Sequence, residues 1–69
     1  MQVHVKFRPR RQDDRSIALP DDATVSTLIA AVGERVDMML AVRGATPIAE
    51  DEALVDGEEI LLLSAASGG

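Results

Sequence analysis

The first nineteen residues alternate between apolar and polar positions in two stretches. From Gln2 to Arg8 every second residue is apolar, and the alternation returns over residues 15–19, with Ile17 and Leu19 as the inward positions. Because successive side chains of a strand point to opposite faces of a sheet, this period predicts two half-buried strands. Pro9 has no amide N–H and ends the first strand, so the polar residues after it form the loop of a hairpin.

A helical period follows the hairpin. Apolar residues recur between Val25 and Val32 at spacings of three and four, which predicts a short amphipathic helix. Thr24 is a favourable N-cap, and Gly33 fits the position just past the helix end. Because a helix of this length is not stable alone, we expect it to lie across the hairpin and bury its apolar stripe.

The segment Met38–Arg43 predicts a third strand, and its inward positions are read as Leu40 and Val42. This phase leaves Met39 and Ala41 on the outer face.

A short edge strand is expected at residues 47–48, followed by an acidic connector over residues 50–59. Leu54 would anchor this connector to the core, and Asp56-Gly57 is typical of a turn.

The last strand, residues 60–63, is apolar at every position, as a strand in the middle of a sheet permits. We therefore expect it to be central and parallel to the first strand. Ile60 and Leu62 would then face the helix, whereas Leu61 and Leu63 would lie on the other face, beside Ala41.

This order of elements predicts an α+β fold of the β-grasp (ubiquitin-like) type, a four- to five-stranded mixed sheet with one main helix packed across it. Residues 1–63 would form the domain. Residues 64–69 are expected to be a flexible C-terminal tail, because the final Gly68 and Gly69 have no side chains to pack and lose the most entropy when ordered.

The amino-acid composition excludes several classes of functional site. The 69 residues make one domain, and the absence of cysteine excludes disulfides, a thiolate nucleophile and cysteine-ligated metals. The spacing of the single histidine and of the carboxylates matches no metal-binding pattern. No apolar run is long enough for a membrane span or a signal peptide, so we expect a soluble, cytoplasmic monomer.

The net charge of −5 argues against direct nucleic-acid binding by the domain as a whole. The arginines of the first loop have no interleaved aromatic residue for base stacking, and their solvation is the simpler interpretation. The acidic residues of the connector are a plausible complement to a basic partner surface. The arginines of the first loop discussed above are Arg8, Arg10, Arg11 and Arg15.

The diglycine end suggests a specific chemistry. Gly68-Gly69, after the small residue Ser67, could thread a narrow channel and present the Gly69 carboxylate without a Cβ in the way. A carboxylate is a poor electrophile, but an acyl-adenylate is a good one. The competing interpretation is a chain end without any role.

Several stretches resemble the family of ubiquitin-like sulfur carriers and small modifiers, which includes ThiS, MoaD, the archaeal small modifiers and the carriers for tRNA 2-thiouridine. The resemblance covers the whole chain. Ala65-Ala66 stands where MoaD proteins more often have a proline pair, and Ser67 where ThiS usually has a bulky apolar residue, so the tail is most similar to that of the tRNA thiolation carriers. The stretches that carry the resemblance are Met1–Lys6, Leu19–Val25, Leu40–Gly44, Leu54–Ile60 and Leu63–Gly69.

The resemblance implies that the protein is not an enzyme but a carrier. An E1-like enzyme would use ATP to adenylate the Gly69 carboxylate, and a sulfurtransferase or tRNA-thiolating enzyme would form and use the thiocarboxylate. The chain itself would bind no cofactor. The implied partner-binding surface consists of Met39, Ala41, Leu61, Leu63, Ala65 and Ala66.

Lys6 is the only lysine and therefore the only side-chain amine that could accept an isopeptide bond, although a solvated strand lysine is the simpler interpretation. The alternatives to tRNA thiolation are a MoaD- or ThiS-type carrier for molybdopterin or thiamin, and a pure protein modifier joined to target lysines. A further alternative is a non-covalent binding module, which would keep its activity without Gly68 and Gly69.

Overall fold

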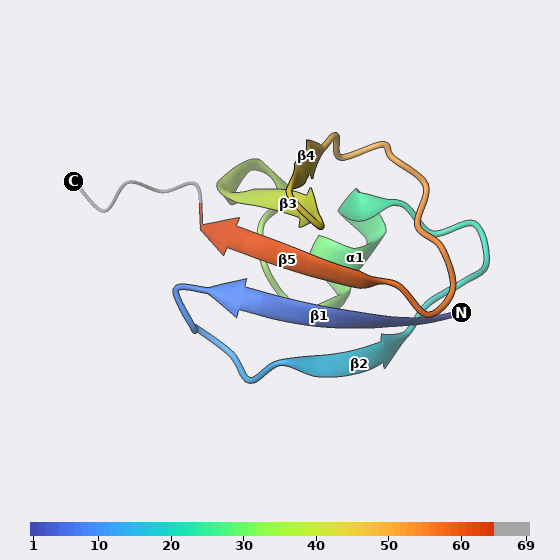
Figure 1. Cartoon of the computed structure of the whole chain (residues 1–69), viewed down its shortest axis with the longest axis horizontal. Coiled ribbons are helices and arrows are strands. Elements are labelled where there is room, and N and C mark those ends of the chain that lie inside the picture. Colours follow the sequence, from blue (N-terminus) through green and yellow to red (C-terminus); the bar gives the residue numbers. More distant parts are fainter. Residues whose placement is uncertain (65–69) are drawn as a thin grey trace.

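The computed structural model describes residues 1–64 of the chain. They form a five-stranded sheet in the order β2-β1-β5-β3-β4, with one helix across one face (Figure 1). β5 is central and parallel to β1, as predicted, and it is antiparallel to β3. Within residues 1–64 no helix is long and apolar enough to cross a membrane. The elements are β1 (Gln2–Arg8), β2 (Arg15–Ala18), α1 (Val25–Ala31), the 3-10 helix η1 (Val36–Met38), β3 (Met39–Arg43), β4 (Thr46–Ile48) and β5 (Glu59–Ser64).

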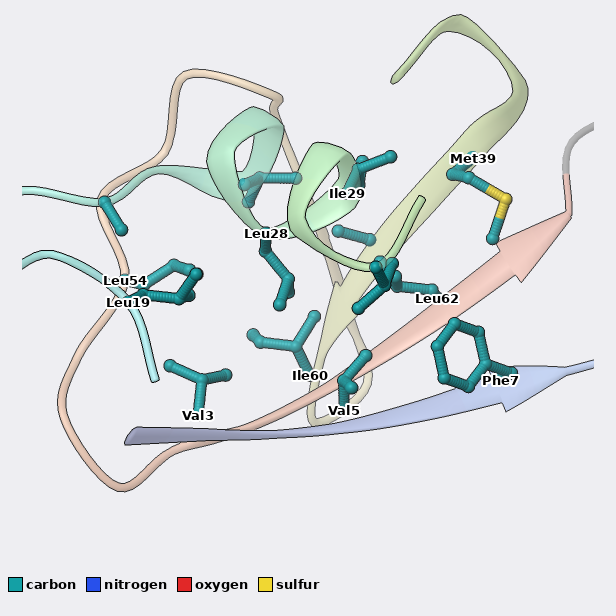
Figure 2. Close-up of a cluster of buried hydrophobic side chains, with 14 residues drawn as sticks. Val3, Val5, Phe7, Leu19, Leu28, Ile29, Met39, Leu54, Ile60 and Leu62 are labelled. Atoms are coloured by element: carbon teal, nitrogen blue, oxygen red, sulfur yellow. The ribbon is translucent and has the colours of Figure 1, made fainter. Parts of the chain in front are cut away.

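The core lies between the sheet and α1 (Figure 2). The inward positions of β1 and β5 are those the alternation predicts, and burying their side chains is the main favourable contribution to folding. All of them are fully buried, together with Leu28 on the facing side of the helix. The strand residues are Val3, Val5 and Phe7 of β1 and Ile60 and Leu62 of β5.

Both ends of α1 are capped locally, which a helix of seven residues requires. At the start, the backbone N–H of Thr24 donates to Oγ1 of Thr27 at 3.2 Å. At the end, Gly33 has φ +79° and donates to the Ala30 carbonyl at 3.0 Å, while Glu34 N–H donates to the Ile29 carbonyl at 3.1 Å. This Schellman arrangement confirms the predicted role of Gly33.

The predicted phase of β3 is wrong. Met39 and Ala41 are 8% and 2% exposed and belong to the core, whereas Leu40 is 42% exposed on the opposite face. The register explains this, because Ala41 lies opposite the buried Leu62 of β5. A shift of one residue moves every side chain of a strand to the other face. Residues 38–42 are all apolar, so the pattern contains no polar position that would fix the phase.

The acidic connector before β5 is held at two points. Leu54 is buried in the core, as expected. Arg43, at the end of β3, forms a forked pair with Glu58, in which its Nε donates to Oε1 at 2.7 Å and its Nη2 to Oε2 at 3.1 Å. The same guanidinium donates to Glu52 and to the Ala53 carbonyl. Hydrogen bonding to Arg43 and to a backbone amide holds the pKa of Glu58 below its usual value.

The expected boundary between domain and tail moves by one residue. Ser64 is the last residue of β5 and lies opposite Met39 of β3, so it belongs to the sheet. The rest of the predicted tail, residues 65–69, lies outside the described residues.

Candidate docking face

Among residues 1–64, no helix lies across one face of the sheet. Figure 1 looks onto this face, and α1 lies behind the strands. The helix-covered face buries the apolar alternate positions of β1, β5 and β3. The intervening positions of the same strands therefore lie on the uncovered face.

Apolar side chains form a continuous group on this face near the end of β5. In the antiparallel β3–β5 pair, Leu40 lies opposite Leu63 and Val42 lies opposite Leu61. Leu40 is exposed, Leu61 and Leu63 are half-buried, and Val42 is largely covered. Side chains directly opposite each other in a sheet are in contact distance. We call these four residues the apolar face; Pro47 of the edge strand β4 extends it beside Val42.

β1 adds basic side chains along one side of the apolar face. In the parallel β1–β5 register, Lys6 pairs with Leu61 and Arg8 pairs with Leu63. Nζ of Lys6 lies 3.4 Å from Oε2 of Glu59, and both side chains are partly exposed. Apolar centres with a charged rim are typical of protein interaction surfaces.

The apolar face includes residues near the end of β5, which the segment with the predicted chemistry follows in the sequence. Leu63 and Ser64 end β5, and the chain continues from there into Ala65, Ala66, Ser67, Gly68 and Gly69, which lie outside the described residues. A partner that covered Leu61 and Leu63 would thus be adjacent to the point from which the diglycine segment departs.

Sequence reasoning identified half of the apolar face. It placed Leu61 and Leu63 on the uncovered side correctly. It also proposed Met39 and Ala41, which are core residues, and it missed Leu40 and Val42. No local signal could have corrected it, because residues 38–42 are all apolar and the phase is set by the pairing of Ala41 with Leu62.

The arginines of the first loop pair with carboxylates close by. Arg10 lies 3.8 Å from Asp13, and Arg11 lies 3.3 Å from Glu34 at the end of α1. Gln12 ties the same loop to the helix end by donating to the Val32 carbonyl at 2.9 Å. The side chains of Arg10 and Arg11 are 68% and 47% exposed, so the solvated loop that the sequence suggested is what the structure shows, with surface ion pairs added to it.

The described residues hold no group of three or more histidine, aspartate or glutamate side chains that could bind a metal ion. The lone histidine, His4, has its Nδ1 3.2 Å from the Ser16 hydroxyl of β2.

Comparison with known proteins supports the fold. No protein-family model matches the sequence, and no curated protein matches it. The crystal structure of SAMP1 from Haloferax volcanii is similar over 100% of both chains, with a TM-score of 0.66 and 23% sequence identity. At this identity the likeness establishes the β-grasp architecture, and it leaves the activity to be argued from the residues.

Proposed function

We propose that this chain is a ubiquitin-like sulfur carrier, whose Gly69 carboxylate is activated by an E1-like enzyme and converted to a thiocarboxylate. The observation that carries the proposal is the apolar face on the central strand β5, which precedes the diglycine segment in the sequence by only a few residues. On a β-grasp domain this arrangement gives a partner both a surface to hold and a slim chain end to process.

The chemistry proceeds in two steps on the partner enzymes. The Gly69 carboxylate oxygen attacks the α-phosphorus of ATP, which forms an acyl-adenylate and releases pyrophosphate. A hydrosulfide ion from the sulfur source then attacks the acyl carbon, so that a C–S bond forms, the C–O bond to AMP breaks, and loss of the S–H proton leaves a thiocarboxylate. The chain supplies the carboxylate and the docking surface, and ATP and sulfur are used by its partners.

We assign the apolar face as the docking site for the E1-like enzyme, and a tRNA uridine as the final acceptor of the sulfur. Exposed apolar side chains such as Leu40 mark interaction sites when they gather in one patch, and burying them favours association. The tail sequence Ala65-Ala66-Ser67 supports tRNA thiolation over molybdopterin or thiamin, for the reasons given by its resemblance to the thiolation carriers.

Intact-mass spectrometry tests the proposal directly. The chain is incubated with ATP, a sulfur source and an E1-like enzyme from the same cell. We expect a mass gain that matches the replacement of one oxygen by sulfur, and no gain in a chain that lacks Gly69. A ladder of heavier, lysine-linked species without the thiocarboxylate would make the protein a modifier instead. If neither product forms, while the same enzyme activates its own cognate carrier in a control, the protein is a non-covalent binding module instead.

A further inference from the structure

Lys6 is the only lysine of the chain, and it lies beside the centre of the apolar face. Its Cα partner in the sheet is Leu61, which in turn lies opposite Val42, so the three form one row across β1, β5 and β3. A group attached to Nζ of Lys6 would therefore extend over or beside Leu61.

The other amine of the chain, that of Met1, is engaged in hydrogen bonds. It donates to the Leu19 carbonyl at 2.7 Å and to Oδ1 of Asp21 at 3.3 Å. Met1 itself packs against the core at the end of β1. An amine must present its nitrogen to the acyl carbon to react, and these contacts occupy the nitrogen and hinder that approach.

The amine of Lys6 is held by weaker contacts than the amine of Met1. Its one ion pair, with Glu59 at 3.4 Å, joins side chains that are 35% and 58% exposed. Exposed pairs of this kind contribute little and open readily. Among the amines that the structure describes, Lys6 is thus the one a reagent or an enzyme can reach.

We propose that Lys6 is an acylation site that switches off docking at the apolar face. The inference rests on the proposed carrier function, because docking to the E1-like enzyme is what the modification would prevent. The donor is an activated acyl group, such as an acyl-adenylate or a thioester, and the activated end of a second copy of this chain belongs to that class.

In the reaction, the deprotonated Nζ attacks the acyl carbon. A C–N amide bond forms, the bond from the acyl carbon to AMP or to the thiol breaks, and the amine loses its remaining excess proton to solvent. The product has no positive charge at Lys6, places bulk beside Leu61 and leaves the Glu59 carboxylate without its partner on the face. Added bulk beside Leu61 opposes close packing of a partner against the apolar face.

The first test measures which amine reacts and needs no partner. The full chain is treated with a limiting amount of the N-hydroxysuccinimide ester of acetic acid, and the sites are identified by peptide mapping. In an unfolded chain near neutral pH the terminal amine is the more reactive, because a larger share of it is unprotonated. We expect Lys6 to be acetylated first in the folded chain and Met1 first in urea. Preferential reaction at Met1 in the folded chain would overturn the assignment.

The second test measures docking through ATP–pyrophosphate exchange by the E1-like enzyme. We expect acetylation of the wild-type chain to lower exchange by about tenfold or more, the scale of a disturbed residue that contributes to an interface. Lys6→Arg cannot be acetylated at residue 6, so its treated sample is compared with its own untreated sample and controls for reaction at Met1. Circular dichroism establishes that each sample is folded.

The two proposals fail differently in this experiment. If the untreated wild-type chain supports no exchange, the carrier function fails. If it supports exchange and chain acetylated at Lys6 supports it equally well, the switch alone is overturned. An equal loss in treated Lys6→Arg would assign the effect to Met1 and would overturn the switch as well.

Discussion

Leu61 and Leu62 are consecutive leucines of β5 that lie on opposite faces of the sheet. Leu62 is fully buried beneath α1, whereas Leu61 is half-buried on the apolar face. Truncating each to alanine removes the same atoms from the same strand. The pair therefore separates packing of the core from docking to a partner.

The expected losses of folding stability differ clearly between Leu62→Ala and Leu61→Ala. Removing a fully buried leucine side chain leaves a cavity and costs about 2–5 kcal/mol of folding stability. Leu61→Ala removes only part of that buried area and should cost about 1 kcal/mol. A domain of this size has a total stability of roughly 3–10 kcal/mol. Leu62→Ala therefore removes a large share of the folding stability, and Leu61→Ala removes a small one.

Urea unfolding followed by far-UV circular dichroism measures both variants. The chain has no tryptophan or tyrosine, so intrinsic fluorescence offers no useful probe. The midpoint should fall strongly for Leu62→Ala and slightly for Leu61→Ala, with an unchanged slope in both. In ATP–pyrophosphate exchange, Leu61→Ala should be impaired while it is still fully folded.

Two results would refute this reasoning. Similar losses of stability in the two variants would mean that the faces of β5 are assigned wrongly. A stable Leu61→Ala chain with wild-type exchange would mean that the apolar face does not dock the activating enzyme, whatever the role of the diglycine segment.

Three further predictions follow from the described contacts. Leu40→Ser should change stability by less than about 1 kcal/mol and lower exchange, because Leu40 is 42% exposed; wild-type exchange would remove it from the docking face. Gly33→Ala should cost about 1 kcal/mol in urea unfolding through backbone strain alone, since its φ is +79° and no atom lies within 4 Å of an added Cβ; an unchanged midpoint would contradict the left-handed cap. Because the pKa of Glu58 is lowered in the folded state by Arg43, its stabilising effect is complete above the ordinary pKa of a glutamate and is lost as the pH falls through the lowered value. Glu58→Gln should therefore lower the urea midpoint at neutral pH and make that midpoint fall less steeply as the pH is lowered. An unchanged acid dependence would exclude a stabilising pair between Arg43 and Glu58.

The fold was largely predictable because most elements carry an unambiguous local signal. β1 alternates between polar and apolar residues, so its period fixes both its existence and its inward face. Thr24 and Gly33 mark the ends of α1 through backbone requirements that few residue types meet. The apolar β5 indicated a central position, and the sheet order confirms it.

The inner face of β3 could not be predicted in this way. Its phase depends on which of its apolar residues lies opposite Leu62, and that pairing is a contact between segments some twenty residues apart. The error at Met39 and Ala41 carried directly into the candidate site, since a docking face is defined by what the core leaves out. The ion pair between Arg43 and Glu58 was also missed, because the two residues are distant in sequence and no spacing pattern links them.

The parallel pairing of β1 and β5 has a mechanical consequence. If the carboxyl end of the chain is attached to a target and pulled, the load enters the domain along the axis of β5. This strand has paired neighbours on both sides, Arg8–Leu63 being the last pair with β1 and Met39–Ser64 the last with β3. Ladder hydrogen bonds run across the strands, so a pull along β5 loads many of them in shear at once instead of opening them one after another. The domain is thus built to resist force from the end at which it would be attached.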